Sequence, residues 1–340
     1  MQTDTTHASV LDSLPGIAMP VAAVPEALTH MWDSTPTETR GAPSAYRASQ
    51  MNLILHFGVK TGVEEAHARF DTAIAFAQLY PCRIIVLCPG ENEGDNEVAM
   101  RAKLYSQCFI GESHREMCCC EALILGYHTM DSRFLEDQVS VWVESDLPVY
   151  YWFHRVPANI VAERYLPFLK ECRRVVYDSA VDGGEMESLA WERQGILSDL
   201  AWARILPLRQ SLGQFLSGFA PDALVEGLRK FTVRATPARL NEARNLACWL
   251  VGGLLGCLRT VGEKSPKIPP YEHDRLPDKG SESIEIEFTY ADPRKFFRWR
   301  HNADSSISIL SANLTGKSIE LPVPIRSLTT AEALAEGLFF

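Results

Sequence analysis

The sequence predicts an α/β protein of two domains, and two apolar runs carry this prediction. Residues 146–154 read Asp-Leu-Pro-Val-Tyr-Tyr-Trp-Phe-His, and residues 173–179 read Arg-Arg-Val-Val-Tyr-Asp-Ser. Aromatic and β-branched side chains dominate both runs, which is the composition of buried strands. Because a segment of helix length separates them, the two strands are expected to lie parallel in one sheet.

A β-α-β unit is expected nearer the N-terminus. Residues 51–59 have the pattern of a strand, and residues 83–87 are apolar throughout. Between them, Thr61 and Glu64 have the spacing of a capping box, which predicts a helix that Thr61 caps and that Tyr80 and Pro81 stop. The connection between these two parallel strands should be right-handed.

The rest of the first domain is expected to mix strands and helices. We interpret residues 97–110 and 114–126 as the two strands of a hairpin, although some of their spacing also fits a helix. Asp131 or Ser132 is expected to cap the next helix. A further helix is expected around residues 161–170. The N-terminal sheet is therefore predicted to be mixed and mostly parallel.

Composition predicts the domain boundaries. Residues 1–48 hold five prolines and no sustained period, which is typical of a disordered N-terminal tail. Residues 49–182 form the N-terminal α/β domain, and residues 183–225 a helical connector, kinked at Pro207. Residues 226–340 form a smaller C-terminal α/β (α+β) domain with an antiparallel meander, ending in a helix.

Charge and cysteine content bound the function. The 340 residues carry a formal net charge of -10, which disfavours nucleic acid and anionic membranes as partners. No apolar run reaches the ~20 residues needed to span a bilayer, and no secretory signal is visible. Nine scattered cysteines, an odd count, favour reduced thiols and a cytoplasmic location. In a strand, Cys118, Cys119 and Cys120 cannot converge on one metal, so they are expected to be buried, with a redox role as the alternative.

No known catalytic motif occurs in the chain. Residues 58–62, Gly-Val-Lys-Thr-Gly, lack the spacing of a phosphate-binding loop, and no dinucleotide-binding fingerprint is present. We therefore expect no cofactor and no metal. The best site-like group is His154, Arg155, Asp178 and Ser179, because polar residues that follow parallel strands meet at one edge of the sheet. Arg83 could join this group or be a solvated charge at the start of a strand.

Residues 199–204, Asp-Leu-Ala-Trp-Ala-Arg, place Trp202 between charged neighbours. Tryptophan and arginine are the usual anchors of protein interfaces. A tryptophan that packs between domains explains the pattern equally well, so both interpretations stay open.

Four segments in order resemble the OpcA family of glucose-6-phosphate dehydrogenase assembly proteins. They are residues 80–86 (Tyr-Pro-Cys-Arg-Ile-Ile-Val), 146–152, 175–179 and 199–204. The chain departs from the family pattern at Tyr80, Tyr151 and Leu208, where His, Trp and Trp are common.

The resemblance implies a non-catalytic cytoplasmic protein that binds glucose-6-phosphate dehydrogenase. It would promote oligomerisation and activity of the dehydrogenase as an allosteric activator, and so the supply of NADPH through the oxidative pentose phosphate pathway. The candidate partner-binding residues are Trp152, His154, Arg155, Asp199, Trp202, Arg204 and Arg209. The alternative is a sugar-phosphate-binding α/β enzyme that uses His154, Arg155 and Asp178.

Overall fold

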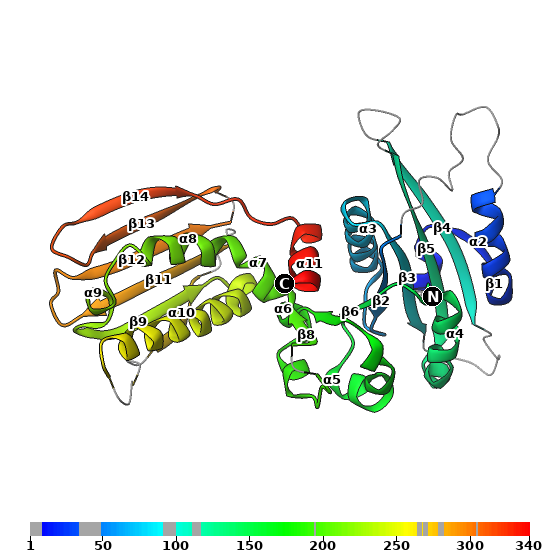
Figure 1. The fold of residues 1–340 in the computed structure, drawn as a ribbon, viewed down its shortest axis with the longest axis horizontal. Coiled ribbons are helices and arrows are strands. Elements are labelled where there is room, and N and C mark those ends of the chain that lie inside the picture. Colours follow the sequence, from blue (N-terminus) through cyan, green and yellow to red (C-terminus); the bar gives the residue numbers. More distant parts are fainter. Residues whose placement is uncertain are drawn as a thin grey trace, which may run out of the picture. The chain divides into compact units, whose positions relative to one another are not determined.

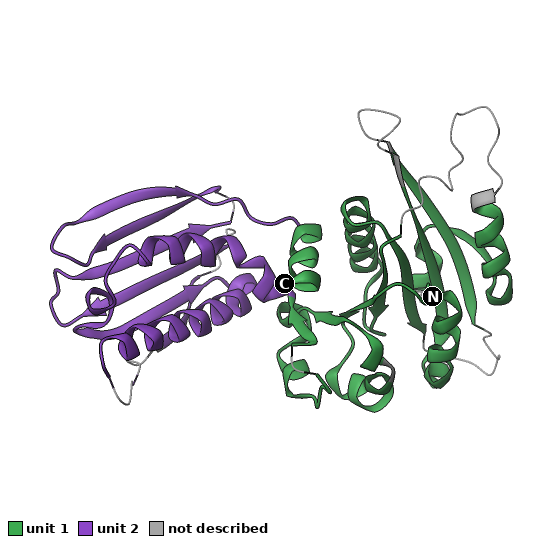
Figure 2. Cartoon of the chain, in the orientation of Figure 1, with its two compact units in different colours: residues 1–199, 330–340 green, residues 200–329 purple. Residues whose placement is uncertain are grey.

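The computed structural model describes residues 9–33, 49–90, 100–110, 117–193, 195–263, 267, 271–277, 282–303 and 305–340. The chain divides into two compact units, which Figure 2 colours separately: unit 1 is residues 1–199 with 330–340, and unit 2 is residues 200–329. The boundary between Asp199 and Leu200 falls inside the range 183–225 that the sequence assigns to a connector. The last helix, which the sequence groups with residues 226–340, belongs to unit 1.

Unit 1 contains an eight-stranded sheet, with helices named and numbered in Figure 1. The six neighbouring strands β5, β3, β2, β6, β7 and β8 are parallel to one another. Strand β4 pairs antiparallel with β5 on one side and with β1 on the other. The expectation of a mixed, mostly parallel sheet is confirmed. In spatial order the strands are β1 (Ile17–Pro20), β4 (Arg101–Ile110), β5 (Met117–His128), β3 (Cys82–Gly90), β2 (Met51–Phe57), β6 (Val149–His154), β7 (Arg174–Tyr177) and β8 (Leu197–Asp199).

The helices of unit 1 cover this sheet and bury its apolar side chains. The α-helices are α1 (Val10–Ser13), α2 (Val24–Asp33), α3 (Val63–Leu79), α4 (Leu135–Trp142), α5 (Ala158–Ile160), α6 (Ser179–Asp182) and α11 (Thr330–Phe339). Short 3-10 segments occupy Val21–Ala23, Thr129–Phe134, Leu166–Glu171 and Glu185–Ser188, and Val161–Tyr165 forms a π turn. The largest buried side chains, such as Trp142 and Trp152, lie between these layers.

The predicted β-α-β unit is confirmed, but both predicted helix caps are wrong. Gly62, without a side-chain hydrogen bond, is the residue before α3. Thr61 instead closes a turn, because its backbone N–H donates to Gly58 O at 3.0 Å. Before α4 the chain makes a 3-10 turn, and His128 caps it by accepting a hydrogen bond from Met130 N at 3.2 Å.

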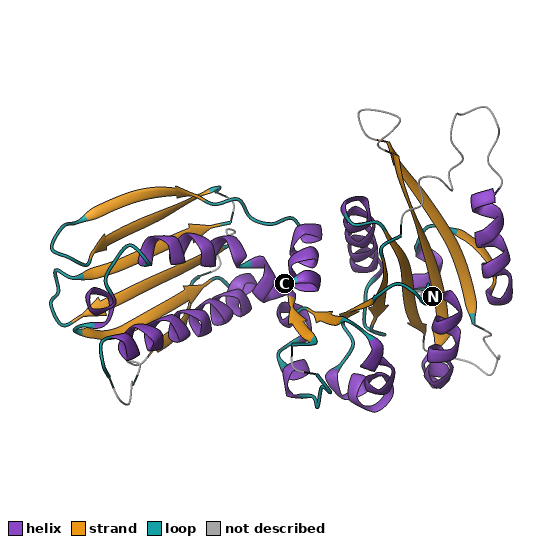
Figure 3. Cartoon of the chain, viewed as in Figure 1, coloured by secondary structure: helices purple, strands orange, loops and turns teal. Residues whose placement is uncertain are grey.

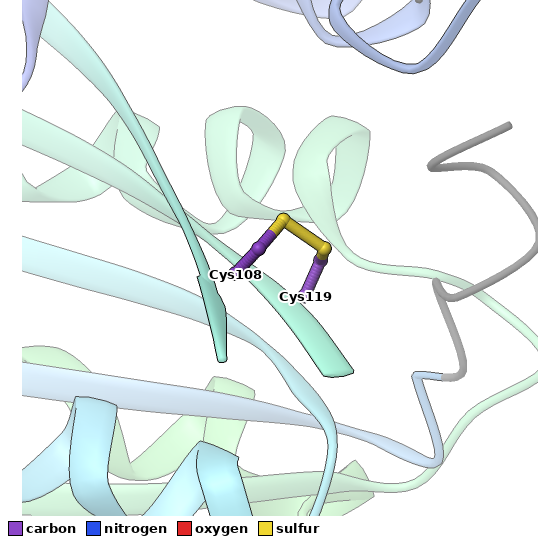
Figure 4. The surroundings of a disulfide bond; sticks show 2 residues. All are labelled: Cys108 and Cys119. Atoms are coloured by element: carbon purple, nitrogen blue, oxygen red, sulfur yellow. A yellow bond between two sulfur atoms is a disulfide. The ribbon is translucent and has the colours of Figure 1, made fainter. Parts of the chain in front are cut away.

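The predicted hairpin is confirmed, and it carries a disulfide. Strands β4 and β5 pair antiparallel, and Cys108 lies directly opposite Cys119 with Cα atoms 4.0 Å apart. Figure 4 shows the bond between the two strands. The expectation that all nine cysteines are reduced is therefore wrong for this pair, because the strand register brings the two side chains face to face. Cys120, at the next position of β5, is buried and is a thiol rather than half of a disulfide.

The expectation of disorder over residues 1–48 is wrong for residues 9–33. Strand β1 pairs with β4, and Val24 and Leu28 enter the core. The tail adheres through backbone pairing and polar contacts that composition does not reveal: Lys103 Nζ donates to Asp12 O at 2.9 Å and to Leu14 O at 2.7 Å. Residues 1–8 and 34–48 lie outside the described residues.

The predicted helical connector, residues 183–225, is not continuous. Strand β8 joins the edge of the sheet, and two helices follow, α7 (Leu200–Arg204) and α8 (Leu206–Leu216). Pro207 lies in the first turn of α8, where the missing N–H has no intrahelical partner to lose. It therefore starts a helix rather than kinking one.

Unit 2 has a six-stranded sheet with its helices alongside, as the colours of Figure 3 show. All neighbouring strands are antiparallel except β10 and β9. The predicted antiparallel meander is confirmed. The order is β10 (Tyr271–Arg275), β9 (Leu228–Ala235), β11 (Ser283–Tyr290), β12 (Phe296–Asn302), β13 (Ile307–Asn313) and β14 (Ile319–Pro324), with helices α7, α8, α9 (Pro221–Val225) and α10 (Leu240–Thr260), the last after a 3-10 turn at Pro237–Arg239.

Candidate functional site

The carboxyl ends of the neighbouring strands β2 and β6 lie where the strand order of the sheet reverses. From β2 the chain passes through α3 to β3, on one side, whereas from β6 it passes to β7, on the other. Such a switch point is where open α/β sheets usually bind ligands. Here two backbones touch: Gly58 N donates to His154 O at 2.7 Å, and a Cβ on Gly58 would lie 1.7 Å from Arg155 O. Only glycine fits this position.

Arg155 has a strained backbone that its neighbours hold in place. Its φ of 58° lies in the left-handed region, which costs free energy for a residue with a side chain. Its N–H donates to Asp182 Oδ1 at 2.7 Å, and its Nε donates to Glu65 Oε2 at 2.5 Å. Strain that several contacts maintain is a feature of functional sites.

Burial sets the protonation of the ionisable groups around Arg155. Burial, together with nearby Arg69, lowers the pKa of His154 to about 4, although Glu65 Oε1 lies only 3.0 Å from Nε2. Burial raises the pKa of Asp182 to about 7. Burial alone would raise the pKa of Glu65 as well, but the hydrogen bond from Arg155 and the neighbouring cations lower it. At neutral pH the site thus holds a neutral imidazole beside a paired carboxylate.

The stability of the protein is expected to fall as the pH falls from 6.5 towards 4.5. The pKa of His56 is lowered to about 3, and those of His154 and His301 to about 4. Their stabilising contribution is complete above the unfolded value of 6.5 and is lost towards the folded value, because only the unfolded chain takes up the protons. Each such proton lowers the free energy of unfolding by about 1.4 kcal/mol per pH unit.

Asp182 has the opposite sign, since its raised pKa stabilises the folded chain at low pH and less so towards pH 7. Asp182→Asn should therefore make the loss on acidification steeper. Urea unfolding at several pH values between 4.5 and 6.5 measures both slopes. A stability that is flat or rises on acidification would contradict the burial of these neutral histidines.

The other predicted site residues hold local structure. Asp178 Oδ1 accepts from Ala180 N at 3.0 Å and so caps α6. Asp199 accepts two hydrogen bonds from Ser179, from the backbone N at 2.9 Å and from Oγ at 2.7 Å. These bonds fasten the end of β8 to the end of β7. Among the described residues, no cluster of three or more metal-ligating side chains occurs.

The predicted partner-binding residues fall into two groups. Trp152 and His154 are each 1% exposed and Asp199 is 9% exposed, so these side chains form no surface, whereas Arg155 is exposed. The remaining three lie in unit 2. There the Arg209 guanidinium lies 3.9 Å from the centroid of the half-buried Trp202 ring, and Arg204 Nε donates to the buried Glu242 at 2.9 Å.

Comparison with known proteins bears on the family. Residues 73–193 match the family model of the OpcA-type assembly proteins, described as "Glucose-6-phosphate dehydrogenase subunit N-terminal domain". These residues are similar to the N-terminal domain of that family. The resemblance found in the sequence is thereby confirmed. No curated protein matches the chain, and no described helix has both the length and the apolar content to cross a membrane.

Two solved structures are similar at a low level. "Glucose-6-phosphate dehydrogenase in complex with its substrate glucose-6-phosphate" aligns over 85% of this chain and 86% of its own, at 11% identity and a TM-score of 0.46. The putative oxidoreductase yvaA from Bacillus subtilis aligns over 83% and 86%, at 9% identity and a TM-score of 0.36. Likeness at this level bears neither on the activity nor on the partners of this chain.

The OpcA-type motifs serve the scaffold. Arg83 lies at the amino end of β3, so it does not join the residues at the carboxyl ends of the strands. It lies inside the protein, with Nε 2.6 Å from Glu121 Oε1 and Nη2 2.7 Å from Glu144 Oε1. Sequence reasoning missed Gly58 and Glu65 at the switch point. Their signal was position alone, a glycine directly after a strand and an acid in the first turn of the next helix.

Proposed function

We propose that this chain binds glucose-6-phosphate dehydrogenase and promotes its oligomeric assembly and activity. The observation that carries the proposal is the match of residues 73–193 to a domain named for that dehydrogenase. In this role the chain acts in the cytoplasm as a non-catalytic allosteric activator. It thereby increases NADPH supply through the oxidative pentose phosphate pathway.

The geometry at the sheet edge supports a role without catalysis. The rival enzyme would use His154, Arg155 and Asp178, but each of them is engaged in holding the backbone or a neighbouring side chain. His154 is 1% exposed and so has no access to a substrate. Incubating the purified chain with sugar phosphates and assaying turnover separates the enzyme from the assembly factor.

Mixing the two purified proteins tests the proposal. Sedimentation velocity should show a complex at micromolar concentrations, with more of the dehydrogenase in its higher oligomer. The rate of NADP reduction by the dehydrogenase should rise in the same mixture. If neither the sedimentation nor the rate changes, the chain is not an assembly factor for this enzyme.

Trp202 is expected to anchor the partner. Its ring is half-buried and stacked under Arg209, so a rigid aromatic and a cation are presented together in unit 2. Trp202→Ala should weaken binding to the dehydrogenase by about 2 kcal/mol, the effect of losing an interface hot spot. Binding titrations and thermal melting on the same sample measure affinity and stability separately.

Arg229→Ala is the matched control, because Arg229 is an exposed arginine of β9 in the same unit. It should change neither the melting temperature nor the affinity. A Trp202→Ala variant that melts several degrees lower but binds as tightly as the parent would assign Trp202 to packing within unit 2 and remove it from the interface.

A further inference from the structure

A pocket of about 240 Å³ opens at the switch point of the unit 1 sheet. Its wall includes the turn after β2, from Phe57 to Lys60, and the turn after β6, from Arg155 to Pro157. The π turn that follows α5 contributes Arg164 and Tyr165. The pocket thus lies where ligands bind in open α/β sheets, beside the strained backbone of Arg155.

Three cations line this pocket in a chain of net charge -10: Lys60, Arg155 and Arg164. The Arg155 guanidinium pairs with Glu65 through Nε, which leaves its two terminal nitrogens for other acceptors. Arg164 Nη1 donates to the backbone oxygen of Thr129 at 2.8 Å, a neutral acceptor, and no carboxylate among the described residues pairs with it. Lys60 is exposed and has no carboxylate partner among the described residues.

This excess of positive charge fits an anion. Grouped cations repel one another in the free protein, and a phosphate group would relieve that repulsion while accepting several charge-assisted hydrogen bonds. Arginine guanidinium groups present paired N–H donors in the geometry that phosphate oxygens accept. A phosphate group offers more oxygens than a carboxylate does, and three cations line this pocket. Phosphate is therefore the better match.

The remaining wall fits the organic part of a small ligand. Val156 and Ile160 provide apolar surface, and a buried network of neutral polar groups lies behind it. In this network His56 Nε2 lies 2.7 Å from Tyr127 Oη, which lies 3.0 Å from Tyr165 Oη. These hydrogen bonds hold the three aromatic rings in place, so a bound ligand would meet a preformed surface on this side of the pocket.

We propose that this pocket binds a small phosphate monoester, of the size of a phosphorylated sugar, through Lys60, Arg155 and Arg164. The pocket volume of about 240 Å³ limits the size of the ligand. Pockets for drug-sized molecules measure roughly 300–1,000 Å³, so this pocket fits a smaller molecule. A dinucleotide would need a larger cavity than the pocket provides. The proposal is independent of binding to a dehydrogenase and is tested on the chain alone.

Isothermal titration of the full chain with glucose 6-phosphate, ribose 5-phosphate and glycerol 3-phosphate tests the proposal. At least one of the three should give saturable binding, whereas glucose should give none and inorganic phosphate should bind more weakly than the ester. Lys60→Ala and Arg164→Ala should each weaken binding of that ester about tenfold or more, the effect of losing a hydrogen bond to a charged group.

Arg173→Ala is the matched control. It removes an equally exposed cation from unit 1 at the amino end of β7, the opposite edge of the sheet, and should leave the affinity unchanged. Thermal melting of all three variants checks that they fold, which surface substitutions should not disturb. Absence of saturable binding by all three esters would overturn the proposal. So would an affinity that Lys60→Ala and Arg164→Ala leave unchanged.

Discussion

Replacing Arg83 by leucine is expected to lower the free energy of unfolding by about 3–5 kcal/mol, the cost of breaking a buried ion pair from one side. Arg83 is 6% exposed, and its Nε lies 2.6 Å from the carboxylate of Glu121, which is 1% exposed. Its Nη1 also donates to Trp142 O at 2.8 Å, the last carbonyl of α4. Without the guanidinium, the buried Glu121 carboxylate loses the ion pair that Arg83 makes with it.

Urea unfolding of Arg83→Leu measures this loss, and Arg101→Leu is its control. Arg101 pairs with Asp12 at 3.0 Å, but both side chains are 52% exposed. An exposed pair contributes about 0–1 kcal/mol, so the control should stay close to the parent. The double variant Arg83→Leu, Glu121→Leu should recover much of the loss, because it removes both buried charges of the pair. Equal stabilities of Arg83→Leu and Arg101→Leu would contradict the buried network.

Gly58→Ala is the second substitution with a large expected effect. The added methyl group would lie 1.7 Å from Arg155 O and 2.3 Å from the carbon of the same carbonyl. Both atoms belong to the backbone, so no side-chain rotation relieves the clash. We expect a loss of about 3 kcal/mol or more, at or above the upper end for overpacking, because the turns after β2 and β6 must move apart.

Gly62→Ala is the control for this effect, four residues further on. A Cβ there meets no atom within 4 Å, and its φ of -75° suits any residue. Its melting temperature should match that of the parent within a few degrees. If both alanine variants melt alike, the two backbones do not approach as closely as described. Because Arg155 lines the proposed pocket, Gly58→Ala should also weaken binding of the phosphate ester.

The strands and their order along the chain could be predicted because each carries a local pattern. The aromatic run at residues 149–154 and the apolar run at residues 83–87 are long and lack polar interruption, so tertiary context had little to override. The same holds for the antiparallel meander, where buried and exposed side chains alternate along β11 and β12. These patterns also predict where the strands end, and the candidate site lies at the ends of two of them, β2 and β6.

Features that depend on contacts between distant segments could not be predicted. The bond between Cys108 and Cys119 follows from the register of two strands, which the sequence does not specify. The order of residues 9–33 comes from pairing with the edge of β4 and from burial of Leu11, Leu14, Val24 and Leu28 against the rest of unit 1. Similarly, the sequence does not show that Trp152 is covered by other parts of unit 1, and so it predicts a partner-binding residue although Trp152 is buried.

The return of α11 to unit 1 has a consequence for the order of synthesis. Phe339 packs its ring against Tyr80 and Phe76, with centroids 4.9 Å and 6.0 Å apart, and Thr72 Oγ1 donates to Thr330 Oγ1 at 3.2 Å. During translation, all of unit 2 is therefore made before the last piece of unit 1. Until residues 330–340 have been made, the part of α3 that they contact stays uncovered. The nascent chain can therefore complete unit 1 only after unit 2 has been made.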